Sequence, residues 1–314
     1  MRNVTQKKRV YMVEFWRFFF CLAVVGLHLF SELKMPYFTA GYLGVEFFFI
    51  LSGYGIASFY LSKMQEQKIT ERVSQLGVYI GKRLRRLYPL YFLALLVMLA
   101  IKSVLAHWSV ADVWEYLKAG WAEFLMMQCG PMGGEVLVFT DWYVAAVFWG
   151  GLLLLLLLLV TGNVGGFLLC PLISFGIYTY YFRLIRKIDV IVSYHAILRG
   201  IAGIALGIFL GFVVHFLLQK GAGDLKKVHP LVQKGLFWGA NGLLAGLFVY
   251  TNYGRRSGAD FVVIGLYTIA LFLLMITKVE LPERVEAFFK KMGQITYPIY
   301  LFQIPIITCI VSLL

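Results

Sequence analysis

Three ionisable side chains lie within the first long apolar run of the sequence. Glu14 and Arg17 are three residues apart, and His28 follows eleven residues after Arg17. On a helix, Glu14 and Arg17 share a face and can form an ion pair. Arg17 and His28 point within about 20° of the same direction, about 16 Å apart along the axis. Because ionisable groups are costly inside a membrane and usually functional, we predict that Arg17 and His28 line opposite ends of one polar cavity.

A carboxylate in the second apolar run is expected at nearly the same depth as the imidazole. In the segment GYLGVEFFFILSGYG, Glu46 lies about four residues from the outer end of its span. A carboxylate that accepts from one ring nitrogen fixes the tautomer and makes the other nitrogen a better base. We therefore predict that Glu46 orients His28 as a general base. The alternative is an interfacial carboxylate facing lipid headgroups. Four glycines would let the helices approach closely, namely Gly41, Gly44, Gly53 and Gly55.

A basic segment precedes the third apolar run. It contains Lys82, Arg83, Arg85 and Arg86, followed by a Tyr-Pro pair. At the start of a helix such cations add to a dipole that favours anions, and guanidinium groups suit phosphate oxygens. We predict a nucleotide-phosphate site built from Arg83, Arg86 and Arg85. The alternative is a topology signal that only keeps this loop on the cytoplasmic side.

The fourth apolar run opens with Asp141, Trp142 and Tyr143 at the predicted outer face. We predict that these three residues contact the acceptor substrate and that Asp141 joins His28 and Glu46. The alternative is a helix N-cap followed by an interfacial aromatic belt.

Other polar residues in apolar runs are weaker candidates. His195 and Arg199 are four residues apart at the start of the sixth run, where they are expected to pair or to line an acceptor entrance. Tyr297, Tyr300 and Gln303 share a stripe of the last run and are interpreted as packing residues.

The elements that must position these residues are transmembrane helices. The 314 residues are 61% hydrophobic and only 14% charged, whereas soluble domains are about a quarter charged. The fold class is therefore all-α, a polytopic helical bundle of nine or ten spans. Nine runs approach the length of about 20 residues that a bilayer requires: 10–31, 42–61, 84–106, 142–160, 164–182, 195–218, 235–252, 261–277 and 292–313. The stretch 111–131 is more polar and is predicted to be interfacial or re-entrant, with a tenth crossing as the alternative.

The distribution of Lys and Arg along the chain predicts the orientation of the protein in the membrane. Most of the 29 Lys and Arg residues fall in segments on the same side as the N-terminus, so we predict a cytoplasmic N-terminus. The net charge of +13 is explained by these loops, and no basic surface for nucleic acid is indicated. The first run is predicted to be a retained span rather than a cleaved signal. Residues 1–314 are interpreted as one domain. The four cysteines indicate neither a disulfide framework nor a metal cluster.

Several of these segments match one known pattern in order. The sequence resembles acyltransferase family 3, which includes bacterial membrane O-acetyltransferases of surface polysaccharides. The resemblance rests on the Arg-x10-His spacing of Arg17 and His28, on GVEFFFILSGYG, on the pair Arg83 and Arg86, on DWYVAAVFW and on YPIYLFQIPII. It implies an acyl-CoA donor, most simply acetyl-CoA, no metal, and a hydroxyl acceptor on an extracytoplasmic carbohydrate or lipid-linked molecule of the cell envelope. It also implies a multi-pass protein of the inner or plasma membrane, in contact with membrane lipid.

The sequence departs from this pattern in places. Glu14 and Glu46 stand where Asp is common, and Gln303 stands where His is common. We therefore assign Gln303 no proton-transfer role. Two other classes of function remain open: a transporter or flippase of an anionic or polyprenyl-linked solute, and an interaction protein that has lost turnover.

Overall fold

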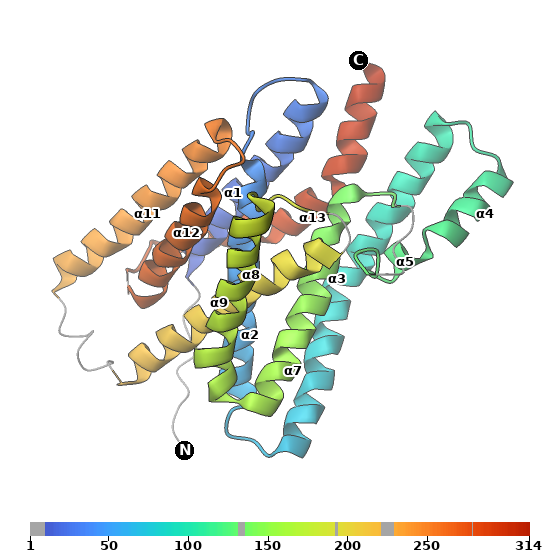
Figure 1. Cartoon of the computed structure of the whole chain (residues 1–314). Coiled ribbons are helices and arrows are strands. Elements are labelled where there is room, and N and C mark those ends of the chain that lie inside the picture. The colour runs from blue at the N-terminus through green and yellow to red at the C-terminus, as the bar shows by residue number, and fades with distance from the viewer. Residues whose placement is uncertain (1–9, 131–135, 192–193, 221–228, 278) are drawn as a thin grey trace.

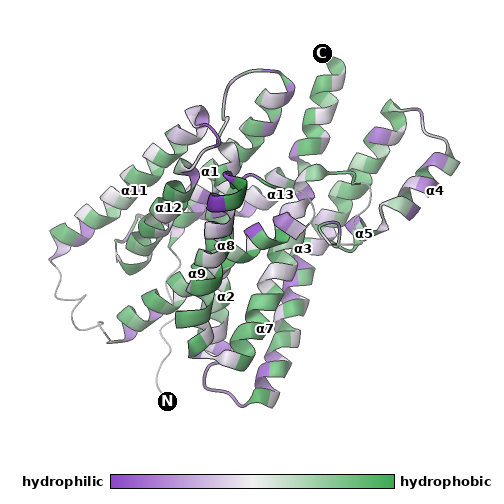
Figure 2. Ribbon diagram, in the orientation of Figure 1, coloured by the Kyte–Doolittle hydropathy of each residue, from purple (hydrophilic) through white to green (hydrophobic). Residues whose placement is uncertain are grey.

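The computed structural model describes residues 10–130, 136–191, 194–220, 229–277 and 279–314, and this part of the chain contains helices and no strands. A helical bundle is expected because backbone groups inside a bilayer must form their hydrogen bonds within the segment. Figure 2 shows hydrophobic residues along most of the long helices, with hydrophilic residues gathered toward helix ends. The predicted all-α membrane bundle is confirmed.

Within the described residues, eight segments are long and apolar enough to cross a membrane. They are α1 (Tyr11–Glu32), η1 with α2 (Gly41–Leu43, Gly44–Lys63), α3 (Ile69–Leu105), η2 to α7 (Phe139–Thr161), η4 to η5 (Gly165–Ile185), α9 (Tyr194–Lys220), α12 (Ala259–Ile276) and α13 (Glu283–Leu313). The predicted span 235–252 lies in α11 (Pro230–Tyr253), which is helical but is not one of the eight. Polar residues such as Asn241 and the many glycines lower its hydropathy.

The stretch 111–131, of which the structure describes residues 111–130, contains no helix long enough to cross a membrane. It forms α4 (Val110–Ala119) and α5 (Trp121–Phe124), which lie beside the bundle (Figure 1). A helix of 10 residues is about 15 Å long, half the thickness of the hydrocarbon core. The described residues of this stretch therefore give no candidate for a tenth crossing, and its interfacial or re-entrant placement stays a prediction.

Glycines set the closest helix contact in the bundle. α2 packs along α9 in its centre (Figure 1). A Cβ at Gly53 would collide with the carbonyl oxygen of Ile204, and one at Gly207 would collide with that of Ile50. The two backbones thus meet where only glycine fits. The same prediction for Gly55 is wrong, because a Cβ there would meet nothing within 4 Å.

α1 packs against the last helix, α13. At their contact, the thiol of Cys21 donates to the backbone oxygen of Thr296 at 3.4 Å. All four cysteines are free thiols. The α1–α13 contact matters for the site because it places the face of α1 that carries Arg17 and His28 against the residues of α13.

The fourth span is not a regular helix. It begins with a 3₁₀ turn, η2 (Phe139–Asp141), continues through α6 (Trp142–Ala145), widens to the π-helix η3 (Ala146–Gly150) and ends in α7 (Gly151–Thr161). The chain just before it is fixed by Glu123, whose buried carboxylate accepts the backbone N–H groups of Leu137 and Val138 at 2.7 and 3.0 Å. Burial raises the pKa of Glu123 to about 7, although both hydrogen bonds oppose the shift.

Candidate active site

His28 lies in the wall of a cavity near the end of the bundle where α1 finishes. The cavity has a volume of about 210 Å³ and is also lined by Tyr42, Trp142, Arg199 and Tyr300. Nδ1 of His28 lies 3.1 Å from Oε1 of Gln303 on α13. A neutral imidazole that donates Nδ1–H to this amide oxygen keeps a lone pair on Nε2. The ring of Phe139 meets the imidazole edge-on, with centroids 5.2 Å apart.

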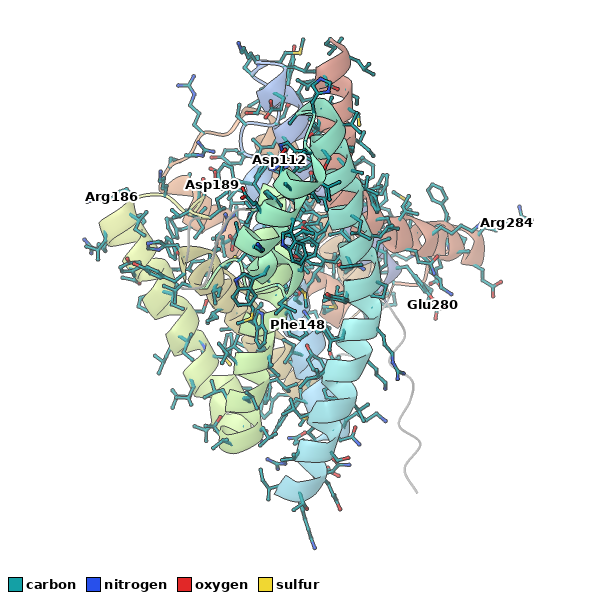
Figure 3. All side chains as sticks on the ribbon, turned by 90° about the vertical axis from the view of Figure 1, so that its right-hand side faces the viewer. Asp112, Phe148, Arg186, Asp189, Glu280 and Arg284 are labelled. Atoms are coloured by element: carbon teal, nitrogen blue, oxygen red, sulfur yellow. The ribbon has the colours of Figure 1, made fainter. Side chains whose placement is uncertain are left out.

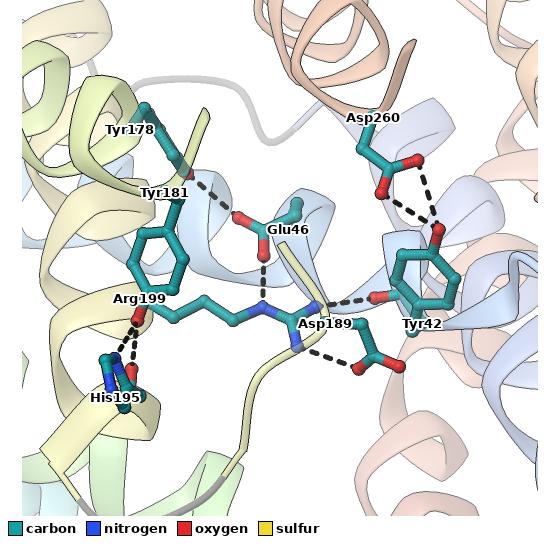
Figure 4. A network of polar contacts seen from close by, with 8 residues as sticks. All are labelled: Tyr42, Glu46, Tyr178, Tyr181, Asp189, His195, Arg199 and Asp260. Carbon is teal, nitrogen blue, oxygen red and sulfur yellow. Dashed lines mark hydrogen bonds and ion pairs between the residues drawn. The ribbon is translucent and has the colours of Figure 1, made fainter. Parts of the chain in front are cut away.

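The predicted hydrogen bond between Glu46 and His28 is wrong. Glu46 is fully buried, with Oε1 accepting from Nε of Arg199 at 2.6 Å and Oε2 accepting from the Tyr178 hydroxyl at 2.9 Å (Figure 4). The alternative of an interfacial carboxylate also fails, because no part of Glu46 is accessible. Glu46 pairs with Arg199 because α2 and α9 cross so closely that a charge on one helix must be neutralised by the other.

Arg199 is the centre of a buried polar network that the sequence does not reveal. Besides Glu46, its guanidinium donates to Oδ1 of Asp189 at 3.3 Å and to the backbone oxygen of Tyr42 at 3.0 Å. It also lies over the ring of Trp142, 5.1 Å from the centroid. The expected pairing of His195 with Arg199 is wrong, because His195 contacts Tyr181 instead, as Figure 4 shows. The five donors of a buried guanidinium are thus largely satisfied, which fixes one wall of the cavity.

Asp189 connects this network to the surface. Its second oxygen accepts from Nη2 and Nε of Arg256 at 2.6 and 2.9 Å, and both residues line the cavity. Beneath them, the Tyr42 hydroxyl donates to Asp260. Asp189 lies in the connection before α9, between Ile188 and Val190, and no pattern in the sequence singles it out.

The three residues predicted to contact the acceptor do not all face the cavity. Trp142 faces the cavity. Asp141 is fully buried, and neither of its oxygens has a hydrogen-bond partner within the described structure. It forms no side-chain N-cap and no hydrogen bond to His28 or Glu46, so neither the predicted cap nor the predicted bonding to His28 and Glu46 is present. Tyr143 lies deeper, beside Ser52 and within electrostatic range of Arg17 and Arg83.

The prediction that Arg17 and His28 line opposite ends of one polar cavity is wrong, because the residues that line the cavity of His28 do not include Arg17. Its guanidinium forms the expected ion pair with Glu14, with Nη1 and Oε2 2.5 Å apart. A Cβ at Gly293 of α13 would collide with this same carboxylate. The ion pair therefore packs tightly against α13.

The arginines predicted to bind the donor phosphates are not at a helix start. α3 begins at Ile69, so Arg83 lies fourteen residues, or about 21 Å, along a continuous helix. The dipole argument for this site is therefore wrong, because the effect is confined to the first turn. Arg83 is half-buried and donates to the Tyr79 hydroxyl at 2.7 Å and to the Val147 carbonyl of the π-helix η3 at 3.3 Å. Arg85 and Arg86 are exposed.

The cavity reaches neither Arg17 nor Arg83, although Arg199 and Arg256 line it. Its lining stops at Tyr300 and Trp142. Tyr143 stands next to Tyr300, with ring centroids 5.1 Å apart, and the Tyr300 hydroxyl donates to the Thr140 carbonyl at 2.6 Å. The barrier between the two ends thus includes tyrosine rings and their hydroxyls. Tyr300 and Gln303, which the sequence pattern assigns to packing, both belong to the site.

Comparison with known proteins identifies the family of the chain. A family model described as an acyltransferase domain, that of acyltransferase family 3, matches residues 10–314. A protein from Rhizobium radiobacter, "Protein 2 in picA locus", is 44% identical over 62 residues, which are 20% of this chain and 30% of that protein. The chain thus matches less than a third of the length of that relative. No solved structure matches. The chain belongs to acyltransferase family 3, and its described residues contain eight candidate membrane spans.

Proposed function

We propose that this membrane acyltransferase moves an acetyl group from cytoplasmic acetyl-CoA to a hydroxyl group of an extracytoplasmic carbohydrate. The observation that carries the proposal is the setting of His28, an imidazole in a cavity wall with Nδ1 held by Gln303. Family membership favours this chemistry over transport or a purely structural role. The proposed orientation has the N-terminus in the cytoplasm, at the inner membrane.

His28 acts as the general base in this proposal. Its Nε2 takes the proton of the acceptor hydroxyl while the alkoxide oxygen attacks the thioester carbon. The tetrahedral intermediate then expels the thiolate of CoA, and the imidazolium returns the proton to sulfur. The products are the acetyl ester and CoA with a free thiol, so neither a metal nor a net proton is required.

Arg199 and Glu46 support the site without meeting the imidazole. Their ion pair holds α2 against α9 and places Trp142 and Tyr42 in the cavity wall. We accordingly assign Glu46 a structural role in place of the orienting role expected from the sequence. Gln303 takes over the orientation of His28.

Replacing Gln303 with leucine should lower kcat about tenfold, because Nδ1 then loses its acceptor and the productive tautomer and ring orientation are no longer fixed. The measurement is steady-state acetyl transfer by purified protein in proteoliposomes. Gln303→Asn keeps an amide but shortens the side chain, so it tests whether the position of the amide oxygen relative to His28 matters. An unchanged kcat in the leucine variant would remove Gln303 from the mechanism.

Acetyl-CoA is proposed to bind at the inner end, with its phosphates on Arg86 and Arg85 and its pantetheine arm directed past Arg83 and Arg17. Since the bilayer core is about 30 Å thick, the arm must carry the thioester toward His28. The barrier that contains Tyr143 and Tyr300 must move aside for this to occur.

The double substitution Arg85→Glu and Arg86→Glu should raise the KM for acetyl-CoA by about tenfold or more, because attraction for phosphate becomes repulsion. Lys68→Glu is the matched control, since Lys68 is also an exposed cation just before the first turn of α3. The KM of the control should stay within a factor of about two. Equal effects in both variants would show a general surface-charge effect and contradict the proposed donor site.

The overall reaction is tested by following radiolabel from acetyl-CoA, added outside inverted vesicles, into glycans enclosed in the lumen. We expect label covalently attached to the lumenal carbohydrate and sensitive to mild base, as an ester is. Movement of an unmodified solute without covalent transfer would support the transport alternative instead.

A further inference from the structure

Five exposed cations gather at the end of the bundle where the cavity lies. One of them lies in η5 (Tyr181–Ile185), two lie in the connection from η5 to α9, and two lie in the connection between α11 and α12. We call them the outer basic cluster: Arg183, Arg186, Lys187, Arg255 and Arg256. The proposed transfer of the acetyl group makes no use of their charge.

The two connections that carry the cluster touch at two points. A Cβ at Gly258 would lie 3.2 Å from the ring of Phe182, and Arg256 forms its ion pair with Asp189. Arg186 adopts a left-handed backbone conformation, with φ of 64°, and its side chain projects from the edge of the molecule while Asp189 lies nearer the bundle (Figure 3). The cations therefore form one surface.

This surface is poorly neutralised by the protein. Among the described residues, the one ion pair of the cluster joins Arg256 to Asp189, and Asp189 also accepts from the buried Arg199. One carboxylate is thus shared by two guanidinium groups. Arg256 itself remains 58% exposed along its side chain.

The position of the cluster is unusual for a membrane protein. Cytoplasmic loops normally carry the excess of Lys and Arg, and orientation follows this bias. The outer basic cluster lies at the end of the bundle opposite the connection 64–68 that precedes α3 (Figure 1). Topology therefore gives no reason for five cations at this end, and ligand binding is the stronger explanation.

The cluster also borders the proposed reaction site. Arg256 and His28 line the same cavity, as does Glu32, one turn after His28 on α1. An anionic group is attracted to the side of Arg256 and repelled from the side of Glu32. An acceptor bound in this field would place its charged group on the cluster and an uncharged hydroxyl near the imidazole.

We propose, on the basis of the proposed function, that the outer basic cluster binds a phosphate or carboxylate group of the acceptor, so that the enzyme prefers anionic over neutral carbohydrates. Guanidinium groups bind such oxyanions through paired hydrogen bonds. Accessible charges that surround a cleft also raise the rate at which an oppositely charged ligand arrives.

The test compares two acceptors that differ only in charge, a neutral oligosaccharide and its phosphorylated counterpart, with full-length protein in vesicles of neutral lipid. We expect kcat/KM to favour the phosphorylated acceptor, and this preference to fall about tenfold in Arg186→Glu/Lys187→Glu. Lys118→Glu is the control, because Lys118 is an exposed cation on α4, outside the cluster, and should leave the preference unchanged.

Three results would overturn this inference while leaving the proposed function intact. These are transfer to both acceptors with equal kcat/KM, a preference that survives the double substitution, and an effect of the substitution that appears only when the vesicles contain anionic lipid. The last result would assign the cluster to lipid headgroups. Absence of transfer to any acceptor would instead contradict the proposed function.

Discussion

Replacing His28 with alanine is expected to lower acetyl transfer by about 10²- to 10⁴-fold, the range typical for loss of a general base. Among the described residues, His28 supplies the one imidazole of the cavity wall, and its Nδ1 contact with Gln303 leaves Nε2 as the proton acceptor. Initial rates of label transfer from acetyl-CoA measure the effect directly. The KM for acetyl-CoA should change little, because the donor phosphates are proposed to bind at the opposite end.

The control for this variant is His107→Asn. His107 is exposed near the same end of the bundle, and its positive φ of 52° is tolerated by asparagine. This variant should retain full activity. Size-exclusion profiles of both variants must match that of the parent protein, because a misfolded variant would also lose activity. A His28→Ala protein that folds and turns over normally would contradict the mechanism.

Arg199→Met should destabilise the protein by about 3–5 kcal/mol, the cost typical of removing one partner from a buried ion pair. The substitution leaves Glu46 and Asp189 as carboxylates without their shared cation, and Glu46 is fully buried. Methionine has similar length, so loss of packing contributes little. The midpoint of thermal unfolding in detergent, followed by loss of the monodisperse peak, measures the effect.

Two further variants test whether the stability loss comes from leaving a buried charge unpaired or from losing any charge of the network. Arg256→Gln removes the exposed partner of Asp189 and should cost no more than about 1 kcal/mol, as exposed ion pairs do. The double variant Glu46→Gln/Arg199→Met should recover much of the lost stability, because the unpaired buried charge at Glu46 is gone. Equal losses for Arg199→Met and Arg256→Gln would show that the buried network does not support the bundle.

Helical periodicity predicts contacts within one helix well. The Glu14–Arg17 ion pair follows from the spacing of residues on α1, whereas the cavity predicted to join Arg17 and His28 is lined by His28 and not by Arg17. The positions of the spans follow from hydropathy, because a helix surrounded by the hydrocarbon core of a bilayer must be largely apolar. Hydropathy does not predict where α3 begins, because its first turns lie outside the apolar run and remain helical.

Contacts between helices cannot be read in the same way. The sequence places Glu46 at the depth of His28, yet Glu46 meets Arg199, which is 153 residues away along the chain. The depth of a side chain in the membrane is only one of its coordinates. It does not determine how the helix is rotated or which helices lie next to it. An amide does not transfer protons, so the sequence alone gives Gln303 no role, although its side chain can still hold the group that does. The predicted phosphate and acceptor sites remain predictions.

The barrier that contains the adjacent rings of Tyr143 and Tyr300 has a consequence for the host cell. A bundle hollow from end to end would let protons and small ions flow down their gradients, dissipating the energy stored across the membrane. With these rings beside the inner end of the cavity, the described structure shows no open path of that kind. In the proposed reaction, the acetyl group would therefore reach the far side of the membrane as an ester while the ion gradients are kept.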